Sequence, residues 1–154
     1  MYSSELFATG VGLVVLLIII LGSITVAIFY LLTLQNLLKE ISPSNREVEP
    51  SNVWLMFIPL FNIIYPFILY PKICDSVKKE LVERGMSESG DYGRGIGITM
   101  PILSLVSFIP VLGGLASLAN FVLFIIFWTK MAGYKTKLIN SKGLEGISNR
   151  PDIL

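Results

Sequence analysis

The sequence predicts an all-α, polytopic membrane protein with four transmembrane helices and a short amphipathic cytoplasmic helix between the second and the third. Of its 154 residues, 53% are apolar and only 15% are charged, and the mean hydropathy is +0.72. Soluble domains carry about 25% charged residues. Long uncharged segments alternate with polar stretches rich in turn formers. We therefore expect one membrane domain over residues 1–154, with no room for a large catalytic ectodomain.

The first predicted span covers residues 6–34, which contain no charged side chain. A helix of this length is about 43 Å long, and the hydrocarbon core needs only about 30 Å. We expect the helix to tilt or to protrude. A cleaved signal peptide is the weaker interpretation, because no Lys or Arg precedes Leu6 and the apolar run is too long.

The second predicted span covers residues 53–70, with Trp54 and Tyr70 as interfacial aromatic residues at its ends. Pro59 and Pro66 each remove a backbone hydrogen bond and should kink this helix. One alternative stays open. The segment could enter and leave the membrane on the same side, which would leave three spans.

A polar stretch at residues 72–94 begins with helical periodicity. Its apolar face consists of three residues at i, i+4 and i+8: Ile73, Val77 and Leu81. Glu80 and Arg84 have the order that favours an i, i+4 ion pair, and Gly85 is suited to end the helix. This predicts a short amphipathic helix at the membrane surface, either as a solvated extension of the second span or as a partner-binding helix.

The uncharged run at residues 95–128 is long enough for two helices joined by a short turn. We predict spans at 95–112 and 115–132. The residues that should form the turn are Pro110, Gly113 and Gly114. The remaining residues, 141–154, form a polar tail with three further turn formers, and we expect it to lack fixed structure.

The distribution of Lys and Arg predicts the topology. With four spans, one side of the membrane carries ten of these residues: Lys72, Lys78, Lys79, Arg84, Arg94, Lys130, Lys135, Lys137, Lys142 and Arg150. The other side has the loop at residues 42–52 with Arg46, and at most Lys39 as well. Since Lys and Arg favour the cytoplasmic side, both termini should be cytoplasmic in a multi-pass protein of the cell membrane.

Small residues predict how the spans pack. Residues on one face of the third span are Gly93, Gly97, Pro101, Ser104 and Ser107, and those on one face of the fourth are Gly113, Ser117 and Asn120. Such faces let helices approach closely in lipid. Asn62 and Asn120 are the conspicuous amides inside the spans. They could stabilise packing, Asn62 as a helix cap and Asn120 across the hairpin, or they could line a polar pathway.

The sequence offers no catalytic, metal or cofactor site. No Asp or Glu lies inside a predicted span, the one Lys or Arg there is Lys130 near the end of the fourth, and the chain has no His. Cys74 is the only cysteine and stands beside Asp75, without a base to activate it. A formal charge of +1 argues against nucleic acid as a partner. Membrane lipid is the expected surrounding.

Two patterns extend beyond single spans. The tetrapeptide at 57–60 (FIPL) recurs at 108–111 (FIPV), which could be a trace of internal duplication. Residues 50–137 join a Trp-containing IPLFN segment to a D-S pair, an R-G turn and the Lys-rich exit FWTKMAGYK. This pattern resembles that of a group of small bacterial multi-pass membrane proteins of unknown function. The resemblance implies a bacterial cytoplasmic-membrane location and brings no activity, ligand or catalytic residue.

These observations lead to one main functional hypothesis and two alternatives. The main hypothesis is a non-enzymatic membrane protein that acts by assembly, as a homo-oligomer or as the small subunit of a membrane complex. The first alternative is an oligomeric channel or membrane-permeabilising effector. The second, a small transporter or a lipid-acting enzyme, lacks the acid-base pair that either would need inside the membrane.

Overall fold

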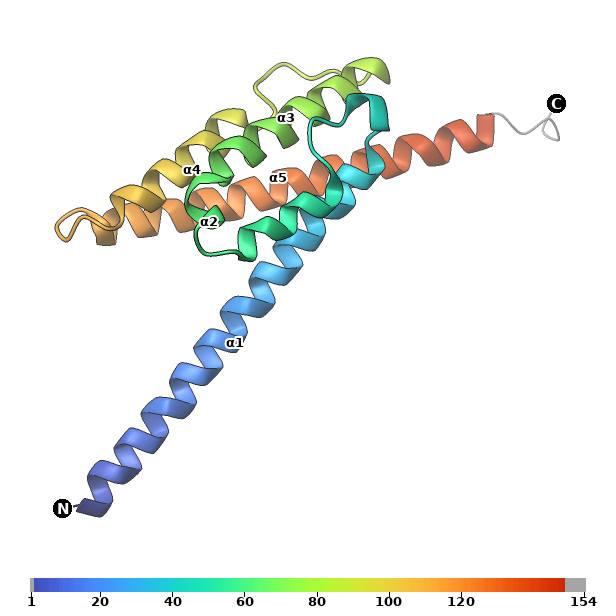
Figure 1. Ribbon diagram of the computed structural model, residues 1–154. Coiled ribbons are helices and arrows are strands. Elements are labelled where there is room, and N and C mark those ends of the chain that lie inside the picture. Colours follow the sequence, from blue (N-terminus) through green and yellow to red (C-terminus); the bar gives the residue numbers. More distant parts are fainter. Residues whose placement is uncertain (1, 149–154) are drawn as a thin grey trace. The chain divides into compact units, whose positions relative to one another are not determined.

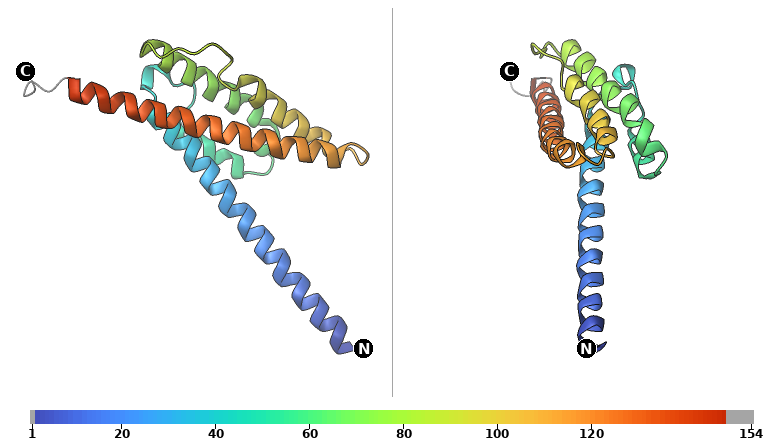
Figure 2. Two further views of the ribbon diagram at one scale, coloured as in Figure 1. Left: turned by 180° about the vertical axis from the view of Figure 1, so that it is seen from behind. Right: turned by 90° about the vertical axis from the view of Figure 1, so that its left-hand side faces the viewer.

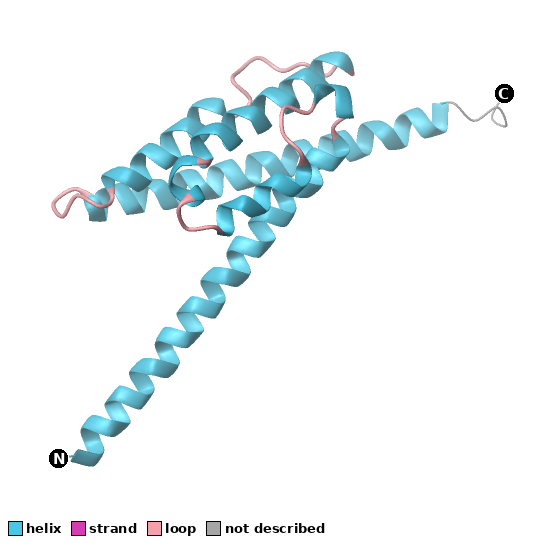
Figure 3. Cartoon of the chain, viewed as in Figure 1, coloured by secondary structure: helices cyan, strands magenta, loops and turns pink. Residues whose placement is uncertain are grey.

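The computed structural model describes the backbone of residues 2–148 and the side chains of residues 9–144. The described residues form helices joined by turns, with no strand among them (Figures 1 and 3). The all-α class is therefore confirmed for this part of the chain. The chain divides into two units, Met1–Leu32 and Thr33–Leu154, where the sequence predicts one domain.

α1 (Tyr2–Glu40) is a continuous helix of 39 residues, and the first unit ends within it, at Leu32. Two described helical stretches are long and apolar enough to cross a membrane, Thr9–Glu40 in α1 and Gly113–Leu144 in α5. Length and composition thus agree with a membrane protein. They do not support four transmembrane helices, because the second and third predicted spans are broken or short.

The second predicted span is not one helix. Residues 53–70 are divided among η2 (Pro50–Phe57), α2 (Phe61–Ile64) and α3 (Pro66–Glu83). Pro59 lies in the turn between η2 and α2, and Pro66 is the first residue of α3. Proline is well tolerated at a first helical position, because that N–H has no intrahelical acceptor. The two prolines therefore separate elements, and the prediction of one kinked helix is wrong.

The predicted surface helix is the second half of α3. Its three apolar residues, Ile73, Val77 and Leu81, are each 0% exposed, so protein covers this face. The helix is continuous with residues 66–70 of the second predicted span, as the interpretation of an extension of that span has it, but its apolar face is covered by protein and does not lie free at a surface. Gly85 ends α3 with a φ of +68°, and its N–H donates to Val82 O at 3.0 Å while Met86 N donates to Leu81 O at 2.8 Å. These two bonds form a Schellman motif.

The last two helices form an antiparallel hairpin. α4 (Arg94–Val106) ends before the predicted span does, and residues 107–112 form the turn. α5 (Gly113–Ser148) continues well beyond the predicted fourth span. The described part of the predicted tail, residues 141–148, is thus helical, and residues 149–154 lie outside the described part. α4 packs between α3 and α5, which run parallel to each other (Figures 1 and 2).

The predicted assignment of the two polar connections to opposite membrane faces is wrong. The connection after α1 contains η1 (Pro43–Asn45) and packs against α3. Its Ser42 N–H donates to Glu80 Oε2 at 2.9 Å, and its Glu47 N–H donates to Ser76 Oγ at 2.8 Å. The chain returns to the same end of the unit because it turns back at residues 58–60. The count of ten Lys and Arg on one side against two on the other assumed these opposite faces, so it no longer predicts the topology.

Candidate functional site

Two turns with the same sequence pattern also have the same backbone hydrogen bonds. The N–H of Ile58 donates to Leu55 O at 3.1 Å, and the N–H of Ile109 donates to Val106 O at 3.0 Å. Each isoleucine carbonyl accepts from the residue four positions later, Asn62 N at 2.9 Å for Ile58 and Gly113 N at 2.7 Å for Ile109. The repeated FIP sequence thus corresponds to a repeated turn, which we call the two FIP turns, residues 57–62 and 108–113.

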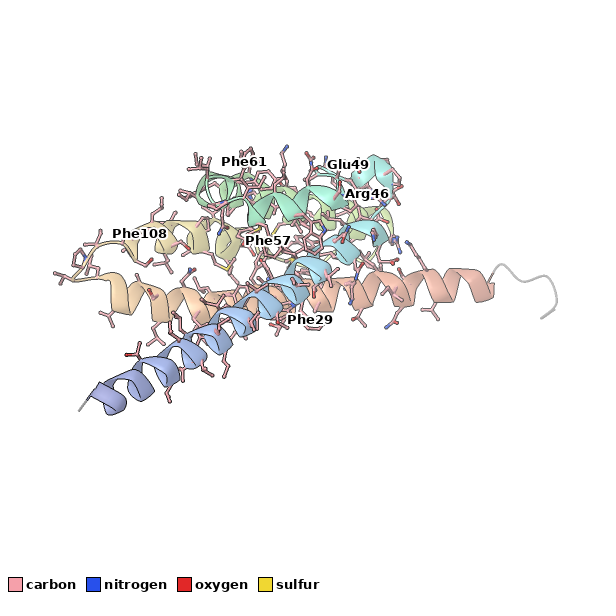
Figure 4. All side chains as sticks on the ribbon, turned by 60° about the horizontal axis from the view of Figure 1, so that its bottom comes forward. Phe29, Arg46, Glu49, Phe57, Phe61 and Phe108 are labelled. Atoms are coloured by element: carbon pink, nitrogen blue, oxygen red, sulfur yellow. The ribbon has the colours of Figure 1, made fainter. Side chains whose placement is uncertain are left out.

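The FIP turns present large apolar side chains outward. Leu60 and Phe108 are each 78% exposed and Val111 is 88% exposed. Figure 4 shows Phe61 and Phe108 toward one end of the helices, with Arg46 and Glu49 toward the other. Apolar patches of this kind on a protein surface mark contact with a partner or a membrane.

A cavity of about 280 Å³ lies between the two turns. Residues from α2, α3, α4 and α5 line it: Asn62, Ile63, Pro66, Tyr70, Met100, Pro101, Ser104, Leu105, Ser107, Phe108, Asn120 and Phe124. Both amides that the sequence singles out are among them, although they are 58 positions apart. Five lining side chains carry a polar group, namely the two amides and the hydroxyls of Tyr70, Ser104 and Ser107, and none is charged.

The hydrogen bonds around Asn120 leave one acceptor without a donor. Ser104 Oγ donates to Met100 O at 3.1 Å, so it can only accept from Asn120 Nδ2, at 2.9 Å. This fixes the amide orientation. Asn120 Oδ1 is buried and has no hydrogen-bond donor among the described residues. The expected bond across the α4–α5 hairpin is therefore present, with an unpaired oxygen beside it.

Asn62 has a different role from the one expected. The residue at the N-cap of α2 is Leu60, and no side chain caps this helix. The side-chain amide of Asn62 is exposed and makes no hydrogen bond to any described residue. It does not cap a helix, and it faces the cavity with its hydrogen-bonding groups free.

The residues predicted to pack along the third span lie in two different surroundings. Gly97 is buried, and a Cβ there would lie 2.9 Å from Tyr70 Cβ and 3.4 Å from Phe127. Pro101 is buried as well, while Ser104 and Ser107 line the cavity. Gly97 is therefore a close contact of α4 with both neighbours, beside the Tyr70 and Phe127 rings, whose centroids lie 5.1 Å apart.

The packing residues of α5 differ from the prediction at two points. Ser117 is exposed, and the buried position is Ala116, one residue earlier. Gly113 is buried in contact with the turn, but its φ is not positive. A Cβ at Gly113 would collide with the carbonyl oxygen of Ser107, so glycine is required for space and not for a left-handed conformation.

Ion pairs form a layer at the other end of the second unit. Among the described residues, six pairs join the end of α1, the connection after it, α3, the α3–α4 loop, the start of α4 and α5: Glu40–Lys142, Glu47–Lys79, Asp75–Arg94, Glu80–Arg84, Glu88–Lys137 and Asp91–Lys130. We call these residues the charged layer. Most of these pairs are solvent-exposed, and such pairs contribute about 0–1 kcal/mol each. The Glu80–Arg84 pair is the exception.

Glu80 is 1% exposed and accepts five hydrogen bonds. The donors are Ser42 N and Oγ, Asn45 Nδ2, and Arg84 Nε and Nη2. Burial raises the pKa of Glu80, but the bonds from Asn45, Arg84 and Ser42 outweigh burial, so the pKa is lowered from 4.5. Glu80 is therefore a charged structural group.

Arg84 uses all of its donors. Nη1 donates to Leu138 O at 3.1 Å and to Ser141 Oγ at 2.7 Å, and Nη2 also donates to Glu40 O at 3.1 Å. The sequence predicts the i, i+4 ion pair but not these partners. A signal existed, because Glu80 and Arg84 follow Ile73 and Val77 by seven residues and so share the buried face of α3.

The remaining candidate groups are structural in this arrangement. Asp91 accepts from Gly93 N at 3.0 Å and Gly95 N at 2.7 Å, and these bonds to the start of α4 lower its pKa. Burial raises the pKa of the Cys74 thiol to about 12. Among the described residues, no three His, Cys, Asp or Glu side chains gather as a metal site.

Comparison with known proteins adds no assignment: no family model, curated protein sequence or solved structure matches the chain.

Proposed function

We propose that this chain is a non-enzymatic cell-membrane protein that is inserted by α1 and by the two FIP turns and that works by assembly. It would act with further copies of itself or as the small subunit of a membrane complex. The observation that carries the proposal is the separation of the second unit into a charged layer at one end and uncharged, outward-facing FIP turns at the other.

The lengths of the helices favour turns that stay within the membrane. α4 has 13 residues, which span about 20 Å, and the part of α5 from Gly113 to Lys130 spans about 26 Å. Both values are less than the roughly 30 Å of a hydrocarbon core. With the charged layer at the membrane surface, the turn at residues 107–112 would lie inside the bilayer and not emerge beyond it.

The backbone of this turn is compatible with such a place. Non-helical backbone in hydrocarbon is unfavourable unless its polar groups are paired. Here the N–H groups of Ser107, Phe108 and Ile109 donate to carbonyls in the last turn of α4, and those of Leu112 and Gly113 donate to Ile109 O. Pro110 has no N–H to satisfy. The proline in each FIP turn, Pro59 or Pro110, leaves one N–H fewer to pair.

The charged layer sets the proposed orientation. Of the twelve Lys and Arg residues, the eleven described ones all lie at residues 39–46, 72–94 and 130–142, which belong to or flank this layer. The positive-inside tendency therefore puts the layer in the cytoplasm. If α1 crosses once, its start lies outside the cell, in contrast to the four-span topology with both termini cytoplasmic. The resemblance to small bacterial membrane proteins supports a bacterial cytoplasmic membrane.

The exposed part of α1 is the proposed assembly surface. Residues 9–26 are exposed throughout, and nothing lies within 4 Å of a Cβ added at Gly12 or Gly22. In lipid, small residues such as these allow another helix to approach closely. A second copy or a partner subunit would pack there.

Cysteine accessibility tests this proposal. Single cysteines at Leu60 and Val111 probe the FIP turns, and one at Lys78 probes the charged layer. In intact cells and in inverted membrane vesicles, we expect a membrane-impermeant maleimide to label only Lys78→Cys, and only in inverted vesicles. Labelling of Val111→Cys in intact cells would show that the hairpin crosses. Reporter fusions at Tyr2 and Leu154 separate the two topologies, since only the four-span one puts both ends in the cytoplasm.

Assembly is tested by the particle mass. We expect the protein in native nanodiscs to give a mass of more than one copy, or to co-purify with a partner chain. Replacing Gly12 and Gly22 together by Leu should return it to a monomer. A monomeric wild-type particle without a partner would contradict assembly.

The cavity favours a channel as the second candidate. Asn62 and Asn120 line it at the depth of the FIP turns, as they would in a polar pathway. A channel should collapse a dye-reported membrane potential on expression, and an assembly protein should not. Loss of that leak in Asn120→Leu, with unchanged particle mass, would favour the channel.

A further inference from the structure

The cavity between the FIP turns has an unusual combination of place and chemistry. It has about 280 Å³, slightly below the 300–1,000 Å³ typical of small-molecule sites. It is open between two turns whose outward residues are apolar. Its lining has two amides and three hydroxyl side chains, Tyr70, Ser104 and Ser107, among apolar residues. A volume of this size accommodates a head group and not a whole lipid.

Both amides of the lining have hydrogen-bonding atoms without partners. The Asn62 amide offers two N–H donors and one acceptor, none used by a described residue, and Asn120 Oδ1 has no donor. An occupant that both donates and accepts hydrogen bonds would supply these missing partners.

The hydroxyl hydrogens of the two serines in the lining are already used. Ser104 Oγ donates to Met100 O at 3.1 Å, and Ser107 Oγ donates to Ser104 O at 2.6 Å. Both oxygens can therefore only accept further hydrogen bonds, and so can Asn120 Oδ1. Apart from Asn62 and the Tyr70 hydroxyl, the polar groups of the lining thus offer acceptors, which favours an occupant with its own O–H donor. No lining residue is charged, so a phosphate or ammonium head group would lack a counter-charge.

We propose that this cavity binds the uncharged hydroxyl head group of a diacylglycerol-type membrane lipid. Asn62 donates to the ester or hydroxyl oxygen, and the lipid O–H donates to a serine or to Asn120. The acyl chains remain in the bilayer beside the exposed Phe108 and Leu105. Access to the lipid rests on the proposed insertion of the FIP turns, and the binding itself can be measured without it.

Binding is tested with full-length protein in detergent micelles, with dioctanoylglycerol as the probe. The readouts are saturable binding and the shift of the thermal midpoint. Two further lipids test the chemistry: the methyl ether of dioctanoylglycerol, which lacks the O–H donor, and dioctanoyl phosphatidic acid, which is charged. We expect both to bind at least 10-fold more weakly than the alcohol.

Variants test whether the lipid binds in this cavity. Asn62→Leu and Ser104→Ala should each weaken binding about 10-fold or more, while Leu118→Ala, on an exposed face of α5, should not change it. Asn62 makes no hydrogen bond to a described residue, so Asn62→Leu should keep the lipid-free midpoint, which serves as the folding check.

Three outcomes would overturn the proposal. They are equal binding of the alcohol and its methyl ether, tighter binding of phosphatidic acid, and no saturable binding to folded protein, which would mean that the cavity holds water only. Because micelle binding does not depend on topology, a maleimide-accessible Val111→Cys with intact binding would count against the proposed insertion alone.

Discussion

Glu80 and Arg84 form a buried ion pair one helical turn apart, and together they join four segments of the chain. Glu80 takes donors from Ser42 and Asn45, and Arg84 donates to the carbonyls of Glu40 and Leu138. The end of α1, the connection after it, α3 and α5 thus meet at one pair of side chains. The pair therefore connects these four segments within the charged layer.

Removal of Arg84 should be strongly destabilising. Arg84→Ala leaves the Glu80 carboxylate buried with neutral donors only, and breaking a buried pair in this way costs about 3–5 kcal/mol. Arg84→Lys should recover only part of this, because an ammonium cannot reproduce the fork of five N–H donors. Thermal and denaturant unfolding in detergent measure the effect. Lys78→Ala, at an exposed position of α3, is the control and should change stability by less than about 0.5 kcal/mol.

The lowered pKa of Glu80 predicts acid sensitivity. A folded-state pKa below the ordinary value of 4.5 means that this group stabilises the fold fully above pH 4.5. The stabilisation is lost as the pH falls below 4.5 and through the lowered pKa. Glu80→Gln should be less stable than the wild type at pH 7 and should lose less on acidification. Unfolding midpoints at pH 7 and pH 3.5 test this, with the exposed Glu49→Gln as control. Parallel pH profiles of wild type and Glu80→Gln would contradict it.

Replacement by alanine should change the stability of the protein in opposite directions at two helical glycines. Gly97→Ala puts a Cβ 2.9 Å from Tyr70 Cβ, which forces α4 away from α3 and should cost about 1–3 kcal/mol. Gly133→Ala meets nothing within 4 Å in α5 and should stabilise the helix by up to about 1 kcal/mol. Unfolding midpoints in one detergent compare them. Equal effects of the two variants would mean that Gly97 is not at a close contact.

Two neighbouring positions of α5 should also differ in how well they tolerate a larger side chain. Ala116 is 6% exposed and Ser117 is exposed, so Ala116→Leu should separate α4 and α5 while Ser117→Leu should be tolerated. The yield of monodisperse protein after detergent extraction reports the difference. A poorer yield for Ser117→Leu than for Ala116→Leu would support the face expected from the sequence pattern instead.

Cys74 should be chemically inert in the folded protein. It is 1% exposed, and burial raises its pKa to about 12, so thiolate is scarce at pH 8. We expect negligible labelling by a maleimide under native conditions and complete labelling after denaturation, measured by intact mass. Rapid native labelling would show that this part of α3 opens. Because Cys74 would not react, single cysteines can be introduced for the accessibility experiment without replacing it.

The sequence alone determined the helical class, the approximate limits of α1 and the hairpin of α4 and α5. These follow from local properties, namely uncharged length, periodicity and turn residues. It also indicated the Glu80–Arg84 pair, the end of α3 at Gly85 and the repeated FIP sequence, which all depend on residues close together in the chain.

Only the tertiary structure decided how these elements combine. Residues 53–70 are hydrophobic enough to span, but hydrophobicity does not distinguish a crossing from a segment that turns back at Pro59. The return of the chain brings Ser42 and Asn45 onto Glu80 and sets Asn62 beside the cavity that Asn120 also lines. These contacts join residues tens of positions apart. Local pattern contains no information on them, because their geometry is fixed by how α3, α4 and α5 pack.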